Sequence, residues 1–319
     1  MKKILFAFFL LIGFAFINRC TTDFDLYADY KDISVVYGLM DSSDDTSWIK
    51  ITKAYTGPGN ALLIALNPDS SNYQNKLNVK LTGIKNGVEL EPIVFDTLTI
   101  HNKKPGDSTF YFPDQLVYFA KTDFDQDAKY TLSINNKGKE ITAETPIVGD
   151  FIISRPNRFI SFTSNSAIEY SLAPNGKRYE SFLVFNYKEI APGYADTLFK
   201  SMRWFIGVDK DNAGQQSYSG DNFYTKLESE VEDVPNVKRW AGSVDIIVAC
   251  GSLVLNSYIE INESDNSLLT EVPVFSNVEG GTGIFASRHT AFKEALLTPK
   301  SIEKLVEEYP DMHFQYPVE

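Results

Sequence analysis

Residues 127–134 read Asp-Ala-Lys-Tyr-Thr-Leu-Ser-Ile, and this stretch determines how the first half of the chain is interpreted. From Tyr130 onward, apolar and polar residues alternate, which is the pattern of a strand with one buried face. The pattern stops at the turn-forming residues 135–138 (Asn-Asn-Lys-Gly) and resumes at residues 140–143 (Glu-Ile-Thr-Ala). Two alternating runs around such a turn predict a β-hairpin.

Tyr130 also indicates the type of β domain. Its setting resembles the corner before strand F of immunoglobulin and fibronectin-type domains, where a tyrosine hydroxyl bonds to the backbone upstream. We therefore predict an immunoglobulin-like or fibronectin-like β-sandwich over residues 28–148, with Pro146 marking its end. Further strands of this domain are predicted at residues 34–39, 47–52, 77–82 and 89–91.

The second half, residues 149–319, is predicted to be a second β-rich domain, sheet-like or barrel-like, with one or two short helices. A short helix is expected at residues 221–228, with Asp221 as its cap. A firmer helix follows Thr298, because a proline at the first helical position and apolar residues at helical spacing come after it. Strands are predicted at residues 150–154, 181–187, 198–208, 242–248 and 253–261.

The first twenty residues predict export and a lipid anchor. Two lysines precede an apolar run at residues 4–17, which is shorter than the roughly 20 residues of a membrane-spanning helix. Cys20 follows where bacterial lipoproteins are cleaved and acylated, although Arg19 departs from the small residue usual before that cysteine. We expect residues 1–19 to be a signal peptide and residues 20–27 a tether that begins at the acylated Cys20. The alternative is ordinary cleavage, with Cys20 left free or removed.

Composition narrows the classes of function. The chain of 319 residues has a formal net charge of −12 and no basic run longer than two residues, so nucleic-acid binding is not expected. Its 17 Tyr and 23 Phe favour strands over helices. With Cys20 acylated, Cys250 has no cysteine partner, and the apolar run around it predicts a buried, inert thiol.

Two motifs resemble ligand sites but lack the required context. Residues 281–286 (Gly-Thr-Gly-Ile-Phe-Ala) have the spacing of a dinucleotide-binding turn without a βαβ unit, so Gly280, Gly281 and Gly283 are expected to allow positive φ or close backbone approach. The alternating carboxylates of residues 123–127 lack the glycine and the final glutamate of a calcium loop, so a solvated turn is expected there. We predict no cofactor and no metal.

No catalytic residues are predicted. The three histidines are scattered, and neither H-E-x-x-H nor G-x-S-x-G occurs. A carboxylate pair such as Glu180 and Glu189 would serve a hydrolase, but no pair is distinguished among the 42 acidic residues. The protein is therefore expected not to be an enzyme.

Aromatic side chains near polar ones are the candidate ligand-binding residues, because rings stack on sugars and hold peptides. Tyr218 lies in a polar run and is expected to be the most exposed of them, whereas a core role is the alternative for Trp204. The candidates are Trp204, Tyr218, Phe223, Tyr224 and Trp240.

Residues 274–285 (Val-Phe-Ser-Asn-Val-Glu-Gly-Gly-Thr-Gly-Ile-Phe) resemble the closing signature of an uncharacterised family of Bacteroidota outer-membrane lipoproteins. This domain of unknown function is often encoded beside TonB-dependent receptors. The resemblance extends to residues 130–134 and 141–146, and so spans most of the mature chain. Its signature positions here are Asn277, Gly280, Gly281, Gly283 and Phe285.

The resemblance implies a lipid-anchored outer-membrane protein, facing the periplasm or the medium, that acts as a non-catalytic accessory or binding module with a TonB-dependent transport system. It supplies no catalytic residues. The first domain would act as a spacer, and the second would present loops around Tyr218 and residues 277–283 to a partner. The alternatives are a stand-alone surface lipoprotein that binds glycans or peptides and, third, a carboxylate-dependent hydrolase.

Overall fold

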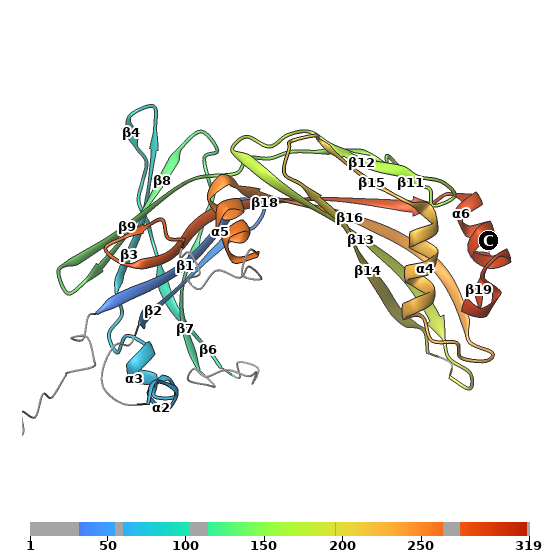
Figure 1. Cartoon of the computed structure of the whole chain (residues 1–319), viewed down its shortest axis with the longest axis horizontal. Helices are drawn as coiled ribbons and strands as arrows, with labels where there is room; N and C mark the ends of the chain where they lie inside the picture. The colour runs from blue at the N-terminus through green and yellow to red at the C-terminus, as the bar shows by residue number, and fades with distance from the viewer. Residues whose placement is uncertain (1–31, 55–59, 102–113, 195, 264–274, 318–319) are drawn as a thin grey trace, which may run out of the picture.

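The computed structural model describes residues 32–54, 60–101, 114–194, 196–263 and 275–317. Within these residues the protein is mainly β, with three sheets and a few short helices, as the sequence predicts. Figure 1 shows two lobes joined in an arch by strands that pass from one lobe to the other. No helix in the described part of the chain is long and apolar enough to cross a membrane.

The first lobe is a β-sandwich. Its strands are β1 (Ile33–Asp41), β2 (Thr46–Ala54), β3 (Asn78–Lys85), β4 (Val88–Glu89), β5 (Ile93–Val94), β6 (Asp96–Ile100), β7 (Gln115–Lys121), β8 (Lys129–Asn136) and β9 (Lys139–Pro146). One layer has the order β1-β2-β7-β6 and the other β9-β8-β3. These are the ABED and GFC orders of an immunoglobulin constant-type domain, so the predicted sandwich is confirmed. The short helices α2 (Ala61–Ala65) and α3 (Pro68–Ser71) follow β2.

Tyr130 occupies the corner that the sequence predicts. Its side chain is buried, and its hydroxyl accepts the backbone N–H of Asp125 at 3.0 Å. The ring meets Phe124 edge to face, with 5.2 Å between centroids. The corner therefore fixes where β8 enters the sandwich, and alternate residues of β8 such as Leu132 and Ile134 then point into the core.

The second lobe has one long sheet and one small sheet. The long sheet has the order β14-β13-β16-β18, and the small one has the order β10-β12-β15. The elements are β10 (Ile153–Arg155), β11 (Phe159–Ile160), β12 (Ser166–Tyr170), β13 (Gly176–Ile190), β14 (Leu198–Asp209), β15 (Gln215–Tyr218), α4 (Gly220–Glu230), β16 (Lys238–Ser252), α5 (Leu253–Glu263), β17 (Val278–Glu279), β18 (Thr282–Leu297), α6 (Pro299–Glu307), the 3-10 helix η2 (Pro310–Met312) and β19 (Phe314–Gln315).

Helices α4 and α6 contribute to the core of this lobe through residues that the sequence assigns to one face. Phe223 of α4 is fully buried and stacks on Phe162 with 3.8 Å between ring centroids. Helix α6 begins as predicted, because the Thr298 side chain accepts the N–H of Ser301 at 3.3 Å. The expected cap of α4 is wrong: Ser219 holds the N-cap position, and Asp221 instead accepts a hydrogen bond from Lys304 at 2.8 Å.

The run at residues 253–261 is a helix, α5, and the strand predicted there is wrong. It begins with the three apolar residues 253–255, and so short an apolar run does not distinguish a strand from a helix. The hydroxyl of Ser252 accepts the N–H of Leu255 at 3.4 Å, so the last residue of β16 serves the free amides of the first helical turn.

Strand β18 belongs to both lobes. Residues 282–288 pair in parallel with β1, and residues 288–296 pair antiparallel with β16. The two sheets that carry the lobes are therefore one ten-stranded sheet. The two hydrophobic cores divide between Ile147 and Val148, except that Val278 and Phe285 join the first core. The boundary at residue 148 stays a prediction, and residues 278–288 pair with strands of the first lobe.

Candidate binding surface

One face of the ten-stranded sheet carries both cores, and the opposite face is here called the outer face. Along β18, Phe285 lies in the first core, while Ala291 and Ala295 lie in the second. All three are odd-numbered, and successive side chains of a strand point to opposite faces. The even-numbered residues of β18 therefore lie on a single outer face that runs from one lobe to the other beneath the arch (Figure 1).

A row of apolar side chains crosses the outer face in the second lobe. The strand register places Phe205, Phe182, Ile247 and Phe292 opposite one another on β14, β13, β16 and β18. Phe205 is 50% exposed and Phe292 is 63% exposed, and the rings of Phe205 and Phe182 lie 5.2 Å apart. The guanidinium of Arg203 covers the Phe182 ring at 4.2 Å, which is a cation–π contact.

Charged side chains occupy three of the four positions in the next row of the same face. Arg203, Val184, Asp245 and Glu294 lie opposite one another across the four strands. The Asn186 side chain donates a hydrogen bond to Asp245 at 2.9 Å. This row therefore places donors and acceptors directly beside exposed rings.

A second aromatic group lies at the far end of these strands. Phe199, Lys188 and Trp240 lie opposite one another on β14, β13 and β16. Phe199 is 78% exposed, and the Lys188 ammonium lies 5.9 Å from its ring centroid. Trp240 is half-buried, and it is the predicted aromatic candidate that the structure places on the outer face.

The first lobe continues the outer face. Trp48 of β2 stacks on Phe119 of β7 with 5.5 Å between ring centroids, and Tyr37 of β1 lies on the same side of the sheet. Trp48 is 43% exposed and Tyr37 is 46% exposed. Both lobes thus present exposed rings on one continuous face.

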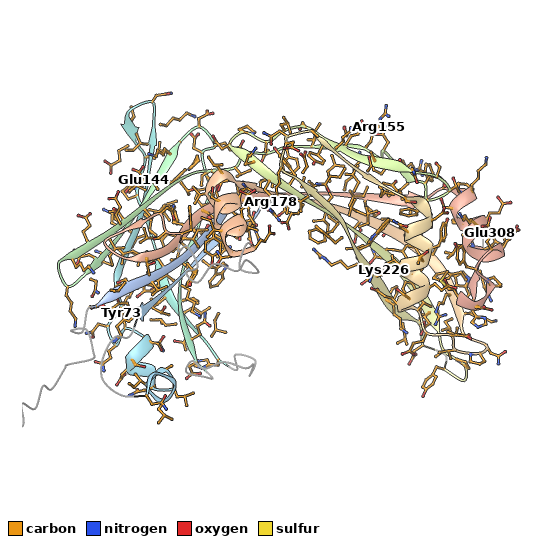
Figure 2. The ribbon with its side chains drawn as sticks, viewed as in Figure 1. Tyr73, Glu144, Arg155, Arg178, Lys226 and Glu308 are labelled. Carbon is orange, nitrogen blue, oxygen red and sulfur yellow. The ribbon has the colours of Figure 1, made fainter. Side chains whose placement is uncertain are left out.

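Helix α5 contacts the sheet where the two lobes join, between the exposed rings of the first lobe and those of the second. Figure 2 shows Arg178 beside this helix, where the lobes join. Arg178 is buried, and its guanidinium donates to Glu180 at 2.7 Å and to Glu263 of α5 at 2.9 Å. Lys210 lies 3.4 Å from Glu260 of the same helix. Ion pairs therefore hold α5 at this position.

Four of the predicted aromatic candidates lie in the second core or pack against it. Tyr218 is 5% exposed, so the expectation that it is the most exposed candidate is wrong. Tyr224 is fully buried and donates a hydrogen bond to the Ser301 carbonyl at 3.1 Å, and burial raises its pKa to about 12. Trp204 points to the same core, with its ring 6.1 Å from that of Tyr218. Phe223 lies between Trp204 and Tyr224 and joins them into one buried cluster.

The signature residues hold the start of β18. The Asn277 side chain accepts the N–H of Phe285 at 2.9 Å and donates to the carbonyls of Phe285 and Glu144 at 2.8 and 3.1 Å. Gly280 and Gly283 have positive φ, and a Cβ at Gly283 would lie 2.0 Å from the Val36 carbonyl oxygen. The expected close backbone approach is confirmed, and in this position Asn277 serves the fold.

Gly281 also lies close to the backbone of a neighbouring strand. It lies between the positive-φ glycines, and a Cβ there would lie 2.7 Å from the carbonyl oxygen of Ser34. Residues 277–283 thus pack against β1 and β9. These contacts give no support to the hypothesis that this loop presents side chains to a partner.

The acidic turn that resembles a calcium loop is neutralised by a lysine. Lys85 lies 2.9 Å from Asp125 and 3.0 Å from Asp127. The hydrogen bond from Lys85 lowers the pKa of Asp125. Among the residues that the structure describes, no three His, Cys, Asp or Glu side chains are grouped so that they would hold a metal ion.

Of the two cysteines, the structure describes only Cys250. Cys250 is fully buried, and burial raises its pKa to about 11, which agrees with the predicted inert thiol. Cys20, the expected lipid anchor, lies outside the described residues.

Reasoning from the sequence missed the outer face. Strand β13 has apolar residues on both faces, with Leu183 and Phe185 inside and Phe182 and Val184 outside. A run that is apolar on both faces is typical of a strand buried on both sides, so nothing in this run marks Phe182 and Val184 as residues of an exposed face.

Comparisons with known proteins add little. No known protein family matches the chain, and no curated protein matches it. Among solved structures, the crystal structure of CBD12 from CALX1.2 matches with a TM-score of 0.16 and 7% identity, over 81% of this chain and 100% of that chain.

Proposed function

We propose that this protein is a non-catalytic, lipid-anchored outer-membrane lipoprotein that binds its partner through the outer face of the ten-stranded sheet. One observation carries the proposal. Of the twenty large hydrophobic side chains exposed in the described residues, nine lie on this face: Tyr37, Trp48, Leu98, Ile100, Phe159, Phe199, Phe205, Phe292 and Leu296.

The composition of the face supports recognition of a protein. Large contiguous apolar patches on a soluble surface mark interaction sites. Aromatic residues and arginine are enriched at protein interfaces, and the face carries Phe205, Phe292, Trp48 and Arg203. The partner proposed from the sequence resemblance is a TonB-dependent receptor, for which this protein would be the accessory subunit.

A stand-alone binder of glycans or peptides is the second candidate. The observation that favours it is the row beside the rings, where Asp245 and Glu294 follow the row of Ile247 and Phe292 and Asp245 accepts a hydrogen bond from Asn186. Exposed rings flanked by hydrogen-bonding groups are what a polar ligand with apolar faces requires.

The test is recovery of the partner from native membranes in mild detergent, followed by mass spectrometry. The wild type is compared with Cys20→Ala, with the double variant Phe205→Glu/Phe292→Glu, and with the control Ile152→Glu. Ile152 is 69% exposed but lies next to the small sheet. We expect the double variant to recover at least about tenfold less receptor than the wild type, as is typical when central interface residues are replaced. The control should recover as much receptor as the wild type.

Two results contradict parts of this proposal. Equal recovery with the double variant would show that the partner contacts another surface. Recovery of the wild type with no receptor would remove the accessory role, and glycan and peptide arrays would then test the second candidate.

A further inference from the structure

Strand β14 forms a free edge of the ten-stranded sheet. It pairs with β13 on one side, and the described residues place no strand on its other side. In an antiparallel pair, alternate residues direct their N–H and C=O groups away from the partner strand. Within the described part of the chain, residues 198–208 make no backbone hydrogen bond to any element other than β13.

This edge is unusual in length and composition. β14 has 12 residues, whereas strands average about 5 to 6 residues. Natural proteins protect sheet edges with short strands, charged side chains, prolines, bulges or covering elements, and of these β14 has two exposed charged side chains and one irregularity in its pairing with β13. The other sheet ends in the described residues are short: β6 has 5 residues, β15 has 4, β10 has 3, and β4 and β17 have 2 each. β14 contains no proline, and Phe199 and Phe205 on its outer-face side are exposed.

The charge of β14 indicates the chemistry of what it binds. The exposed charged residues of β14 are Lys200 and Arg203, and its one carboxylate, Asp209, is buried at the end of the strand, in a chain of net charge −12. Lys200 is paired with Glu189 at 2.7 Å. Arg203 forms no ion pair within the described residues and lies over the ring of Phe182 on the outer face. An acidic side chain placed opposite Arg203 would therefore find an unpaired cation.

We propose that β14 binds an extended, acidic segment of a partner protein by strand addition. The proposal rests on the proposed function as a binding module and names how its partner is held. Main-chain hydrogen bonds to the free edge supply affinity in this mode, and alternate side chains supply specificity.

The register of β14 defines the segment. Residues opposite Phe205, Arg203, Ser201 and Phe199 in an antiparallel added strand all point to the outer face, because side chains alternate. The segment therefore carries, at alternate positions and in this order, an apolar residue, a carboxylate, a small polar residue and an apolar residue. Its apolar residues extend the exposed row of phenylalanines described above.

The probe is a labelled peptide with phenylalanine, glutamate, serine and phenylalanine at alternate positions and threonine between them. Its binding to the full-length protein in mild detergent is measured by fluorescence anisotropy, beside a peptide with lysine in place of glutamate. Two further peptides are N-methylated, one at the four named positions and one at the threonines. Only one of these two sets of amides faces β14 in an added strand.

We expect the glutamate peptide to bind more tightly than the lysine peptide and Arg203→Glu to reverse this preference, with about a fivefold change for each peptide. Arg158→Glu is the matched control, because Arg158 also lies over a phenylalanine ring, at 5.4 Å, but at the opposite edge of the same lobe. One N-methylated peptide should lose binding, and the other should keep it.

Three results would overturn the proposal: no binding of either peptide, equal binding of the two N-methylated peptides, or a β14-to-β14 dimer in sedimentation that excludes the peptide. If the peptide fails while receptor recovery depends on Phe292, the binding module stands and strand addition is wrong. If the peptide binds and no receptor is recovered, the edge site stands and the proposed partner is wrong.

Discussion

Replacing Gly283 by alanine should separate β1 from β18 and destabilise the whole arch. Gly283 has φ of +117°, a conformation that only glycine adopts readily, and a residue held there costs about 1–3 kcal/mol. An added Cβ would also lie 2.0 Å from the Val36 carbonyl oxygen and 2.9 Å from the Val36 nitrogen. These neighbours are backbone atoms, so relief requires the strand itself to move.

The size of the effect follows from this geometry. Displacing β1 weakens two or three of its hydrogen bonds to β18, each contributing about 1 kcal/mol. Together with the backbone strain, the free energy of unfolding should fall by about 4 kcal/mol, which is exceptional for a single methyl group. Urea unfolding followed by fluorescence measures the loss. Hydrogen exchange of residues 35–41 should accelerate, because these residues pair with β18.

The matched control is Gly207→Ala in the same sheet. A Cβ at Gly207 would meet the Gln216 side chain at 3.8 Å, and its φ is not positive, so the free energy of unfolding should change by less than about 0.5 kcal/mol. A loss below about 1 kcal/mol for Gly283→Ala would refute the reasoning, because the backbone would then have room that its geometry denies.

Asn277→Ala should lower the free energy of unfolding by about 1–3 kcal/mol, because the N–H and C=O of Phe285 lose their partners, and unchanged exchange of the Phe285 amide would contradict this. Burial raises the pKa of Tyr224 from 10.0 to about 12, so the unfolded chain releases this proton first and stability should fall by roughly 2–3 kcal/mol between pH 10 and about 12. Unfolding at several pH values should show a shallower fall for Tyr224→Phe, and identical slopes would count against a buried, neutral hydroxyl. Arg239→Met should lower the free energy of unfolding by about 2–3 kcal/mol, because the buried Glu189 loses the guanidinium at 2.7 Å and keeps only Lys200, and Glu189→Gln added to it should restore part of the loss in urea unfolding.

Features set by neighbouring residues were predictable from the sequence. The hairpin around residues 135–138, the corner at Tyr130 and the start of α6 at Thr298 each depend on contacts within about five positions of the chain. The types of residue at these positions are therefore enough to predict the local backbone geometry. The sandwich followed from them because the first lobe uses a common strand order.

Features set by distant residues were not predictable. β18 pairs with β1, which lies more than two hundred positions earlier, and nothing near residue 282 specifies that partner. Tyr218 sits in a polar run, yet its ring packs on Phe162 at 5.6 Å in the folded chain. The outer face is assembled from strands of both lobes, and its phenylalanines are indistinguishable in sequence from those that fill the core.

The shared strand β18 also determines how the protein carries load. A pull on the predicted N-terminal tether would reach the fold through β1, and β1 is joined to β18 by the register from Val35 to Asp41. Because this force acts along the strands, it loads the hydrogen bonds between them in shear. All of these bonds then resist the force at the same time, instead of opening one after another. The remainder of β18 delivers the same force to β16 and to the outer face of the second lobe. Tension between a membrane anchor and a bound partner would therefore pass through one continuous beam.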